Sequence, residues 1–262
     1  MENALTINHL SKTYTDFKLD DISFTVPKGC VVGLIGENGA GKTTTLKAAL
    51  NLIKNDCGET LFFDQILDEN SSSLKEDIGV VLDAPCFHDV LRVRDINKVM
   101  KNIYSNWDDQ RFIDLIFKFK LPMDKRVKEY SKGMKMKLQI AVALAHNPKL
   151  LILDEATSGL DPVAREEMMD IFQEFIQNEN NAILMSSHIT SDLDKIADYI
   201  VFIHNGKVVF QEEKESLLEM MGILKCGASQ FEPEIKKRYR DVMIDPATIE
   251  EIMLFFVKGE VA

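Results

Sequence analysis

The sequence is poor in several features, and each shortage excludes a class of protein. Its four cysteines are widely scattered with no C-x-x-C pair, which predicts neither a zinc site nor a disulfide framework and fits a reducing cytosol. No stretch approaches the roughly 18 consecutive apolar residues that a membrane helix needs, and the start of the chain lacks the basic and apolar segments of a signal peptide. The 31 lysines and arginines are outnumbered by 42 acidic residues, for a net charge of −11, which argues against a nucleic-acid partner. We therefore expect a cytoplasmic protein without nucleic acid as a partner, whose work at a membrane would require another chain.

Glycine gathers in one octet, residues 36–43, which reads GENGAGKT. It fits the pattern G-x-x-x-x-G-K-[ST] of a loop that binds phosphate through its backbone N–H groups. In this pattern Lys42 supplies a positive charge for the β- and γ-phosphates, and the hydroxyl of Thr43 is a ligand for Mg²⁺. An apolar run at 30–35 precedes the loop and a helical pattern follows it, so the sequence predicts binding of ATP with Mg²⁺. The residues expected to contact the nucleotide here are Gly36, Glu37, Asn38, Gly39, Ala40, Gly41, Lys42, Thr43 and Thr44.

The order of hydrophobic patterns predicts an α/β fold. Residues 1–30 alternate in polarity as antiparallel strands do, and an Asn-Gly pair at 205–206 predicts a hairpin. Between them, apolar runs alternate with helical patterns, including one at 189–200, and a polar loop is expected at 68–73. We therefore expect a P-loop NTPase with a mostly parallel sheet, an antiparallel β edge and an inserted helical subdomain.

The same patterns suggest the domain boundaries. Residues 1–215 are expected to form the ATPase domain, with the helical subdomain at about 87–145, and 216–262 a C-terminal extension. The last helical pattern of the extension is expected to dock on its own domain, because four apolar residues share one of its faces: Ile249, Ile252, Met253 and Phe256.

A second motif lies at the end of the most apolar run, LLILDE at 150–155. Open α/β sheets bind ligands where their parallel strands end, so Asp154 and Glu155 are expected at the same edge as the phosphate loop. Asp154 suits the Mg²⁺ shell, and Glu155 suits a base that polarises the attacking water.

Four motifs in order, covering roughly residues 4–215, resemble the ATP-binding cassette (ABC) ATPases. They are GENGAGKT, then YSKGMK at 130–135, LLILDEATSGLD at 150–161 and SSH at 186–188. The resemblance implies that two cassettes pair head to tail with each ATP between them. Ser131 and Gly133 would then contact the γ-phosphate held by the partner, and Asp161 would act across the same interface.

The resemblance implies three further roles. His188 matches the histidine that bonds the γ-phosphate, so the catalytic residues are expected to be Glu155, His188 and Lys42. Tyr14, in KTYTDF, matches an aromatic residue that stacks on adenine. Asp83 stands where the family usually has a glutamine that touches the metal, and a carboxylate there can still reach Mg²⁺. The expected metal ligands are therefore Thr43, Asp154 and Asp83.

The signature itself departs from the common family pattern. Two glycines and a glutamine usually follow the serine, whereas this chain has Lys132, Gly133 and Met134. Lys132 either adds positive charge that faces the γ-phosphate of the partner or crowds the closed dimer. The similarity of SKGM to variants in bacterial exporters favours an active ATPase.

The resemblance implies a function in transport. It favours the ATP-hydrolysing subunit of an ABC exporter, located on the inner face of the cell membrane and coupled to a separate transmembrane permease. The second cassette is either another copy of this chain or a sister chain. Two alternatives stay open, an importer ATPase and a non-transport ABC protein that acts as a nucleotide-dependent switch.

Overall fold

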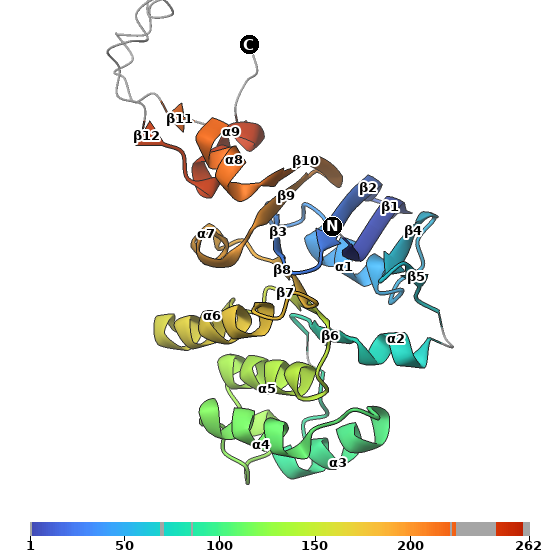
Figure 1. Cartoon of the computed structure of the whole chain (residues 1–262), viewed down its shortest axis with the longest axis vertical. Coiled ribbons are helices and arrows are strands. Elements are labelled where there is room, and N and C mark those ends of the chain that lie inside the picture. The colour runs from blue at the N-terminus through green and yellow to red at the C-terminus, as the bar shows by residue number, and fades with distance from the viewer. Residues whose placement is uncertain (1, 69–70, 85, 221, 224–244, 259–262) are drawn as a thin grey trace, which may run out of the picture.

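Two β-sheets form the centre of the protein, a larger one with mostly parallel strands and a smaller antiparallel one (Figure 1). The computed structural model describes residues 2–68, 71–84, 86–220, 222–223 and 245–258. The larger sheet has six strands in the order β10 (Lys207–Glu213), β9 (Tyr199–His204), β3 (Val31–Ile35), β8 (Ala182–Ser186), β7 (Leu150–Asp154) and β6 (Ile78–Val81). The smaller sheet has four strands in the order β2 (Lys18–Pro27), β1 (Asn3–Thr13), β4 (Cys57–Phe62) and β5 (Gln65–Ile66).

The strands of the larger sheet are parallel except for β10, which pairs antiparallel with β9. Every residue of β3, β7 and β8 is buried, because this sheet is covered on both faces. The smaller sheet is antiparallel throughout. The register of β7 and β8 places Asp154 beside Ser186, so both strands deliver polar side chains to one edge of the sheet.

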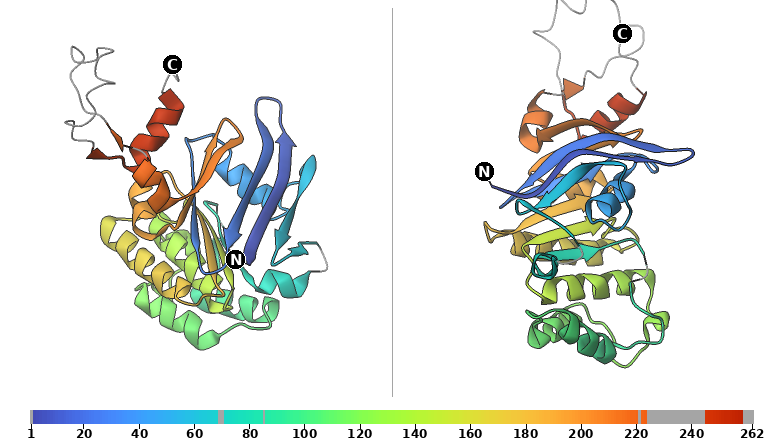
Figure 2. Two further views of the ribbon diagram at one scale, coloured as in Figure 1. Left: turned by 45° about the horizontal axis from the view of Figure 1, so that its top comes forward. Right: turned by 90° about the vertical axis from the view of Figure 1, so that its right-hand side faces the viewer.

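Helices fill the space between the sheets and cover the outer face of the larger one. Helix α1 (Lys42–Ala49) contacts β1 and β2 of the smaller sheet and β7 of the larger. The other face of the larger sheet packs against α5 (Lys132–Ala145), α6 (Pro162–Ile176) and α7 (Thr190–Ile196). On the far side of α5 lie α3 (Val93–Ile103) and α4 (Asp109–Lys118), with the short η1 (Val127–Glu129) in the connection between α4 and α5 (Figures 1 and 2).

The C-terminal segment folds back on the sheet. It contains α8 (Lys214–Met220), the pair β11 (Gly222–Ile223) and β12 (Asp245–Pro246), and α9 (Ile249–Lys258). Ile249 and Ile252 are fully or almost fully buried, and the ring of Phe256 lies 6.0 Å from that of Phe202 in β9. The expectation that this helix docks on its own domain is confirmed; residues 224–244 of the extension lie outside the described part of the chain.

Two expectations about local structure need correction. The polar stretch at 68–73 contains the start of a short helix, α2 (Ser72–Glu76), which is too short to show a helical pattern. The helical pattern at 189–200 ends at Ile196, because the next residues join the sheet. Asp198 fixes that change: its carboxylate accepts a hydrogen bond from Val31 N at 2.7 Å, and its own N–H donates to Val31 O at 2.8 Å.

The expected hairpin at 205–206 is confirmed. Asn205 and Gly206 both have positive φ, 48° and 73°, as a type I′ turn requires. A Cβ atom on Gly206 would lie 1.9 Å from the carbonyl oxygen of Lys18, so only glycine fits where this turn passes over β2. Among the helices that the structure describes, none has the length and apolar character to cross a membrane.

Candidate functional site

The expected site residues meet where the parallel strands of the larger sheet end. The phosphate loop follows β3, the acidic pair begins at the last residue of β7, and the Ser-Ser-His segment begins at the last residue of β8. A hollow of about 650 Å³ opens at this edge. The expected nucleotide, catalytic and metal residues that line it are Glu37, Asn38, Gly39, Gly41, Lys42, Thr43, Thr44, Asp83, Glu155 and His188. The expected residues therefore lie together at one edge of the sheet.

Close packing fixes the path of the phosphate loop. A Cβ atom on Gly36 would lie 2.3 Å from the carbonyl oxygen of Ile203, so a side chain there would push the loop away from β9. Gly41 has φ of 115° and precedes α1 without any side chain that caps the helix. The first N–H groups of α1 thus remain available to an anion, with the positive end of the helix dipole behind them.

Lys42 is the buried cation of the site. Its ammonium donates to the carbonyl oxygens of Gly36 at 2.7 Å and Glu37 at 3.2 Å, and it lies 3.8 Å from Glu155 Oε1. Burial lowers the pKa of Lys42, while the carboxylates of Glu155 and Asp154 act in the opposite direction. The ammonium is therefore held among oxygen atoms at the base of the loop, where phosphate oxygens can replace the carbonyls.

Asp154 is almost completely buried and is not among the residues that line the hollow; it contacts the hollow through Thr43, which does line it. The hydroxyl of Thr43 donates to Asp154 Oδ2 at 2.8 Å, and the hydroxyl of Ser186 donates to Asp154 Oδ1 at 2.6 Å. These two bonds fix the carboxylate and join the start of α1 to the ends of β7 and β8. Hydroxyl and carboxylate oxygens are the hard donors that Mg²⁺ prefers.

No cluster of three or more histidine, cysteine or acidic side chains suited to a metal ion occurs in the described part of the chain. A site for Mg²⁺ does not need such a cluster, because this ion usually binds one or two carboxylates and completes its coordination shell with water and substrate phosphates. The Thr43 and Asp154 pair fits that pattern.

Glu155 and His188 form a polar pair at the mouth of the hollow. His188 Nδ1 lies 2.5 Å from Glu155 Oε2. Glu155 also has φ of 53°, a left-handed conformation that costs a non-glycine residue about 1–3 kcal/mol. Its N–H donates to the carbonyl oxygen of Ser186 at 3.1 Å, which holds the strained turn in place. The strain aims the carboxylate back toward Lys42 and His188, and the sequence pattern gave no sign of it.

The residues expected to act across a dimer interface lie together, outside the lining of the hollow. Ser131 Oγ caps α5 by accepting from Met134 N at 3.2 Å. Asp161 caps α6 by accepting from Ala164 N at 3.0 Å and Val163 N at 3.1 Å, and these N–H bonds lower the pKa of its carboxyl. A Cβ atom on Gly133 would lie 3.2 Å from Leu160 Cδ2, so the starts of α5 and α6 pack closely.

One aromatic residue of the site was missed by the sequence analysis. Tyr14 is 45% exposed and is not among the residues that line the hollow, whereas Phe17 is. A Cβ atom on Gly41 would lie 2.9 Å from Phe17 Cζ, which places this ring over the phosphate loop. The chain turns between the two rings through a bond from Tyr14 N to Phe17 O at 2.7 Å. The signal for Phe17 was present as the second aromatic residue of KTYTDF.

Asp83 and Lys132, the two departures from the family pattern, contact each other. Lys132 Nζ lies 3.0 Å from Asp83 Oδ1. Asp83 lines the hollow that contains Thr43, as expected of a metal ligand, but its partner in this structure is an ammonium group. Each departure is visible in the sequence on its own, whereas the contact between them is visible only in the structure.

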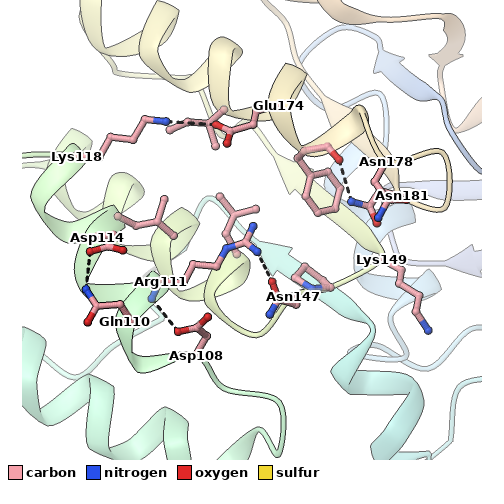
Figure 3. Close-up of a pocket in the computed structure, with 15 residues that line it drawn as sticks. Asp108, Gln110, Arg111, Asp114, Lys118, Asn147, Lys149, Glu174, Asn178 and Asn181 are labelled. Carbon is pink, nitrogen blue, oxygen red and sulfur yellow. Dashed lines mark hydrogen bonds and ion pairs between the residues drawn. The ribbon is translucent and has the colours of Figure 1, made fainter.

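A second hollow of similar size, about 670 Å³, lies between α4 and α6 (Figure 3). It includes Lys149 and Asn181, which precede β7 and β8, so it lies at the opposite edge of the sheet from the phosphate loop. Its cations are already paired: Arg111 with Asn147, Lys118 with Glu174 at 3.5 Å, and Lys149 with Asp77 at 2.9 Å. The hollow at the phosphate loop is therefore the candidate site.

Comparisons of sequence agree with this geometry. Residues 19–158 match the profile of the family described as ABC transporter. The lantibiotic transport ATP-binding protein SrtF of Streptococcus pyogenes is 37% identical over 212 residues, which cover 80% of this chain and 90% of that protein. The bacitracin transport ATP-binding protein BcrA of Bacillus licheniformis is 34% identical over 213 residues, covering 80% of this chain and 69% of that protein.

Solved structures have the same fold. One described as an ATP-binding subunit of an ABC transporter is 25% identical, covers 97% of this chain and 100% of its own, and has a TM-score of 0.79. A dimeric ATP-binding cassette in a post-hydrolysis state with ADP and Pi is 20% identical, covers 80% of this chain and 98% of its own, and has a TM-score of 0.71. The expected α/β fold with a mostly parallel sheet and helical segments is confirmed.

Proposed function

The chain belongs to the ABC transporter family and is an ATP-binding subunit that hydrolyses ATP, and from this premise we propose that it powers export through a separate transmembrane permease. The observation that carries the proposal is the set of contacts at the phosphate loop, where Lys42, Thr43 and the Glu155–His188 pair line one hollow and Asp154 is bonded to Thr43 beneath it. The names of SrtF and BcrA, transport proteins for a lantibiotic and for bacitracin, support a compound of that kind as cargo.

In the proposed reaction, the residues of the site have different tasks. The backbone of the phosphate loop and the ammonium of Lys42 bind the β- and γ-phosphates of ATP. Glu155 accepts a proton from the attacking water at its carboxylate, and His188 orients that carboxylate and bonds the γ-phosphate. The strained backbone at Glu155 supports this role, since strain of this kind is concentrated at functional positions.

Thr43 and Asp154 would hold Mg²⁺, with Asp83 as the third proposed ligand. A bound Mg²⁺ would supply positive charge that stabilises the negative charge developing on the phosphates. Ser186 would contribute by holding the Asp154 carboxylate in place through its hydrogen bond to Oδ1. The other oxygen, Oδ2, then stays turned toward Thr43. Phe17 and Tyr14 are the two candidates to cover the adenine.

A second cassette would complete the site. We infer that Ser131, Gly133 and Asp161 bind the nucleotide held by a partner, which is either a second copy or a sister chain. The three residues lie together at the starts of α5 and α6, and this shared surface supports the inference. The helical subdomain at about 87–145 and the segment after Asp83 would contact the permease, and the protein would then lie on the inner face of the cell membrane, in the cytoplasm.

The first test replaces Glu155 with glutamine, which keeps the shape of the side chain and removes the base. We expect turnover of Mg-ATP to fall about 10²–10⁴-fold, the usual worth of a general base. ATP binding should persist, so Glu155→Gln should elute as a dimer in size-exclusion chromatography with excess ATP. Glu166→Gln is the matched control, because Glu166 pairs with Lys195 on an exposed face at 2.5 Å.

Two measurements test the proposal, one of ATP turnover and one of the direction of transport. Turnover equal to wild type in Glu155→Gln would remove the proposed base and favour a nucleotide-dependent switch. The direction of transport is tested in cells that carry the permease, by following a fluorescent lantibiotic. Export predicts that Glu155→Gln raises its accumulation in the cells relative to wild type, whereas an importer predicts the reverse.

A further inference from the structure

Lys132 stands in the first turn of α5, where a positive charge is unfavourable. The helix dipole places its positive end there, and acidic residues are the usual occupants. The first turn of α5 contains no acidic residue that would offset the charge of Lys132. The compensating carboxylate comes instead from Asp83, the second residue after the end of β6.

The Lys132 side chain bridges three functional segments. Its aliphatic stem runs over Gly159, where an added Cβ atom would lie 3.4 Å from Lys132 Cδ. Its ammonium lies 3.0 Å from Asp83 at the rim of the nucleotide hollow. Its backbone is flanked by Ser131 and Gly133, the residues assigned to the nucleotide of the second cassette. One side chain thus connects the cap of α5, the segment after Glu155 and the rim of its own site.

The contact between Lys132 and Asp83 is weak enough for another anion to replace Asp83. The side chains of Lys132 and Asp83 are 58% and 42% exposed, so water competes with the contact and the attraction between them is weak. A triphosphate carries several negative charges and strong acceptor oxygens, whereas Asp83 carries one charge. When a bound triphosphate comes within reach of α5, it should therefore displace the carboxylate.

We propose that Lys132 alternates between two anions: Asp83 of its own chain while cassettes are apart, and the triphosphate bound by a second cassette once they pair. The proposal rests on the function proposed above. Asp83 acts as a competitor that holds the ammonium back from the interface until ATP on the other cassette replaces it. Pairing of cassettes is then coupled to the charge of the nucleotide, and the two unusual residues function as a unit.

A double-mutant cycle in the Glu155→Gln background tests the pair. The variants are Asp83→Asn, Lys132→Met and the double change; methionine keeps an unbranched stem over Gly159 and removes the charge. The measurement is the ATP concentration that gives half-maximal dimer in light scattering, with ATP affinity for the separate chains measured by calorimetry.

We expect Lys132→Met to raise that ATP concentration about three- to tenfold. Asp83→Asn should lower it when Lys132 is present and should lose this effect in the Lys132→Met chain, a coupling of about threefold or more. Asp89→Asn is the matched control. Asp89 pairs at 3.5 Å with Lys135, which like Lys132 belongs to α5, and Asp89 does not line the nucleotide hollow. It should leave the ATP concentration unchanged.

The outcomes separate this proposal from the proposed function. If all variants form dimers and the effect of Asp83→Asn is the same in both backgrounds, the alternation of Lys132 is wrong and the function stands. If the Glu155→Gln chain binds ATP but forms no dimer in any variant, pairing between copies fails and the alternation fails with it. Thermal unfolding of each variant checks the fold, which the loss of an exposed ion pair should barely affect.

Discussion

At the residue scale, the charged groups of the site differ in how deeply they are buried. Asp154 is 1% exposed and Lys42 is 6% exposed, and each is surrounded by hydrogen-bond partners that offset the cost of burial. The side chain of Glu155 is 14% exposed and that of His188 is 45% exposed. The more deeply buried charges are thus the ones proposed to hold phosphate and metal, and the more exposed groups are the ones proposed to handle the proton of the attacking water.

The two aromatic candidates for the adenine give a prediction at this scale. We expect Phe17→Ala to weaken ATP binding about 5- to 150-fold, in line with the roughly 1–3 kcal/mol lost when an aromatic partner of a base is removed. Tyr14→Ala should change the affinity less than about twofold, because Tyr14 lies outside the hollow. The measurement is calorimetric titration of each variant with Mg-ATP.

Inorganic triphosphate serves as the control ligand, because it has no base and its affinity should be the same in both variants. A larger loss in Tyr14→Ala than in Phe17→Ala would show that Tyr14 stacks on the adenine, as the sequence resemblance implied, and that Phe17 serves only to pack the phosphate loop.

Motif residues and loop contacts differ in how far the sequence could predict them. The phosphate loop, Asp154 and Glu155 were predictable because strand ends in a parallel sheet meet at one edge, whatever the connections between them. The Asp83–Lys132 pair and the position of Phe17 were not, because they depend on where separate loops pass in space. The backbone strain at Glu155 also has no sequence pattern, since glutamate rarely takes that conformation.

At the element scale, one buried histidine joins the ends of three helices. His146 follows α5, its Nδ1 lies 3.0 Å from the carbonyl oxygen of Glu76 at the end of α2, and its ring stacks on Tyr104 after α3 with centroids 4.0 Å apart. It therefore ties the end of α5 to the ends of α2 and α3. Neither the short α2 nor this junction was visible in the sequence, because a five-residue helix shows no periodicity and stacking partners carry no motif.

This junction predicts a dependence of stability on pH. Burial lowers the pKa of His146 below its ordinary value of 6.5, so the folded state keeps the ring neutral where the unfolded state binds a proton. Its contribution to stability is fully present above pH 6.5 and is lost as the pH falls from there through the lowered folded pKa. We expect the free energy of unfolding in urea to decrease between pH 7.5 and pH 5.5, and His146→Phe to reduce that decrease.

His146→Phe should cost about 1 kcal/mol at pH 7.5, because phenylalanine keeps the stack on Tyr104 but loses the bond to Glu76. His9→Phe is the control, since the side chain of His9 is 78% exposed. If both variants show the same pH dependence as the wild type, the decrease at low pH arises elsewhere in the chain and the role assigned to His146 is wrong.

At the scale of the whole molecule, the net charge opposes the pairing that the site requires. Each chain carries −11, so two copies repel each other before bound ATP adds further negative charge. The attraction proposed to overcome this repulsion is local, between a triphosphate and residues at the starts of α5 and α6. Repulsion between whole chains acts over distances comparable with the Debye length, which shrinks from about 30 Å at 0.01 M salt to about 10 Å at 0.1 M.

The salt dependence of pairing therefore has a predicted sign. Raising NaCl from about 0.01 to 0.1 M screens the distant charges more than the contacts within the interface, so the Glu155→Gln chain should form its ATP-dependent dimer several-fold more tightly. The measurement is the dimer dissociation constant by sedimentation at saturating ATP, which removes any effect of salt on nucleotide binding. Replacing Glu215 and Glu219 of α8 with glutamine removes two negative charges from exposed positions away from the nucleotide hollow and should flatten the dependence. A dimer that instead weakens steadily as NaCl rises from 0.01 M would mean that interfacial ion pairs outweigh the repulsion between the chains. The contact of Lys132 with the second triphosphate would then contribute more binding free energy than the net charge costs.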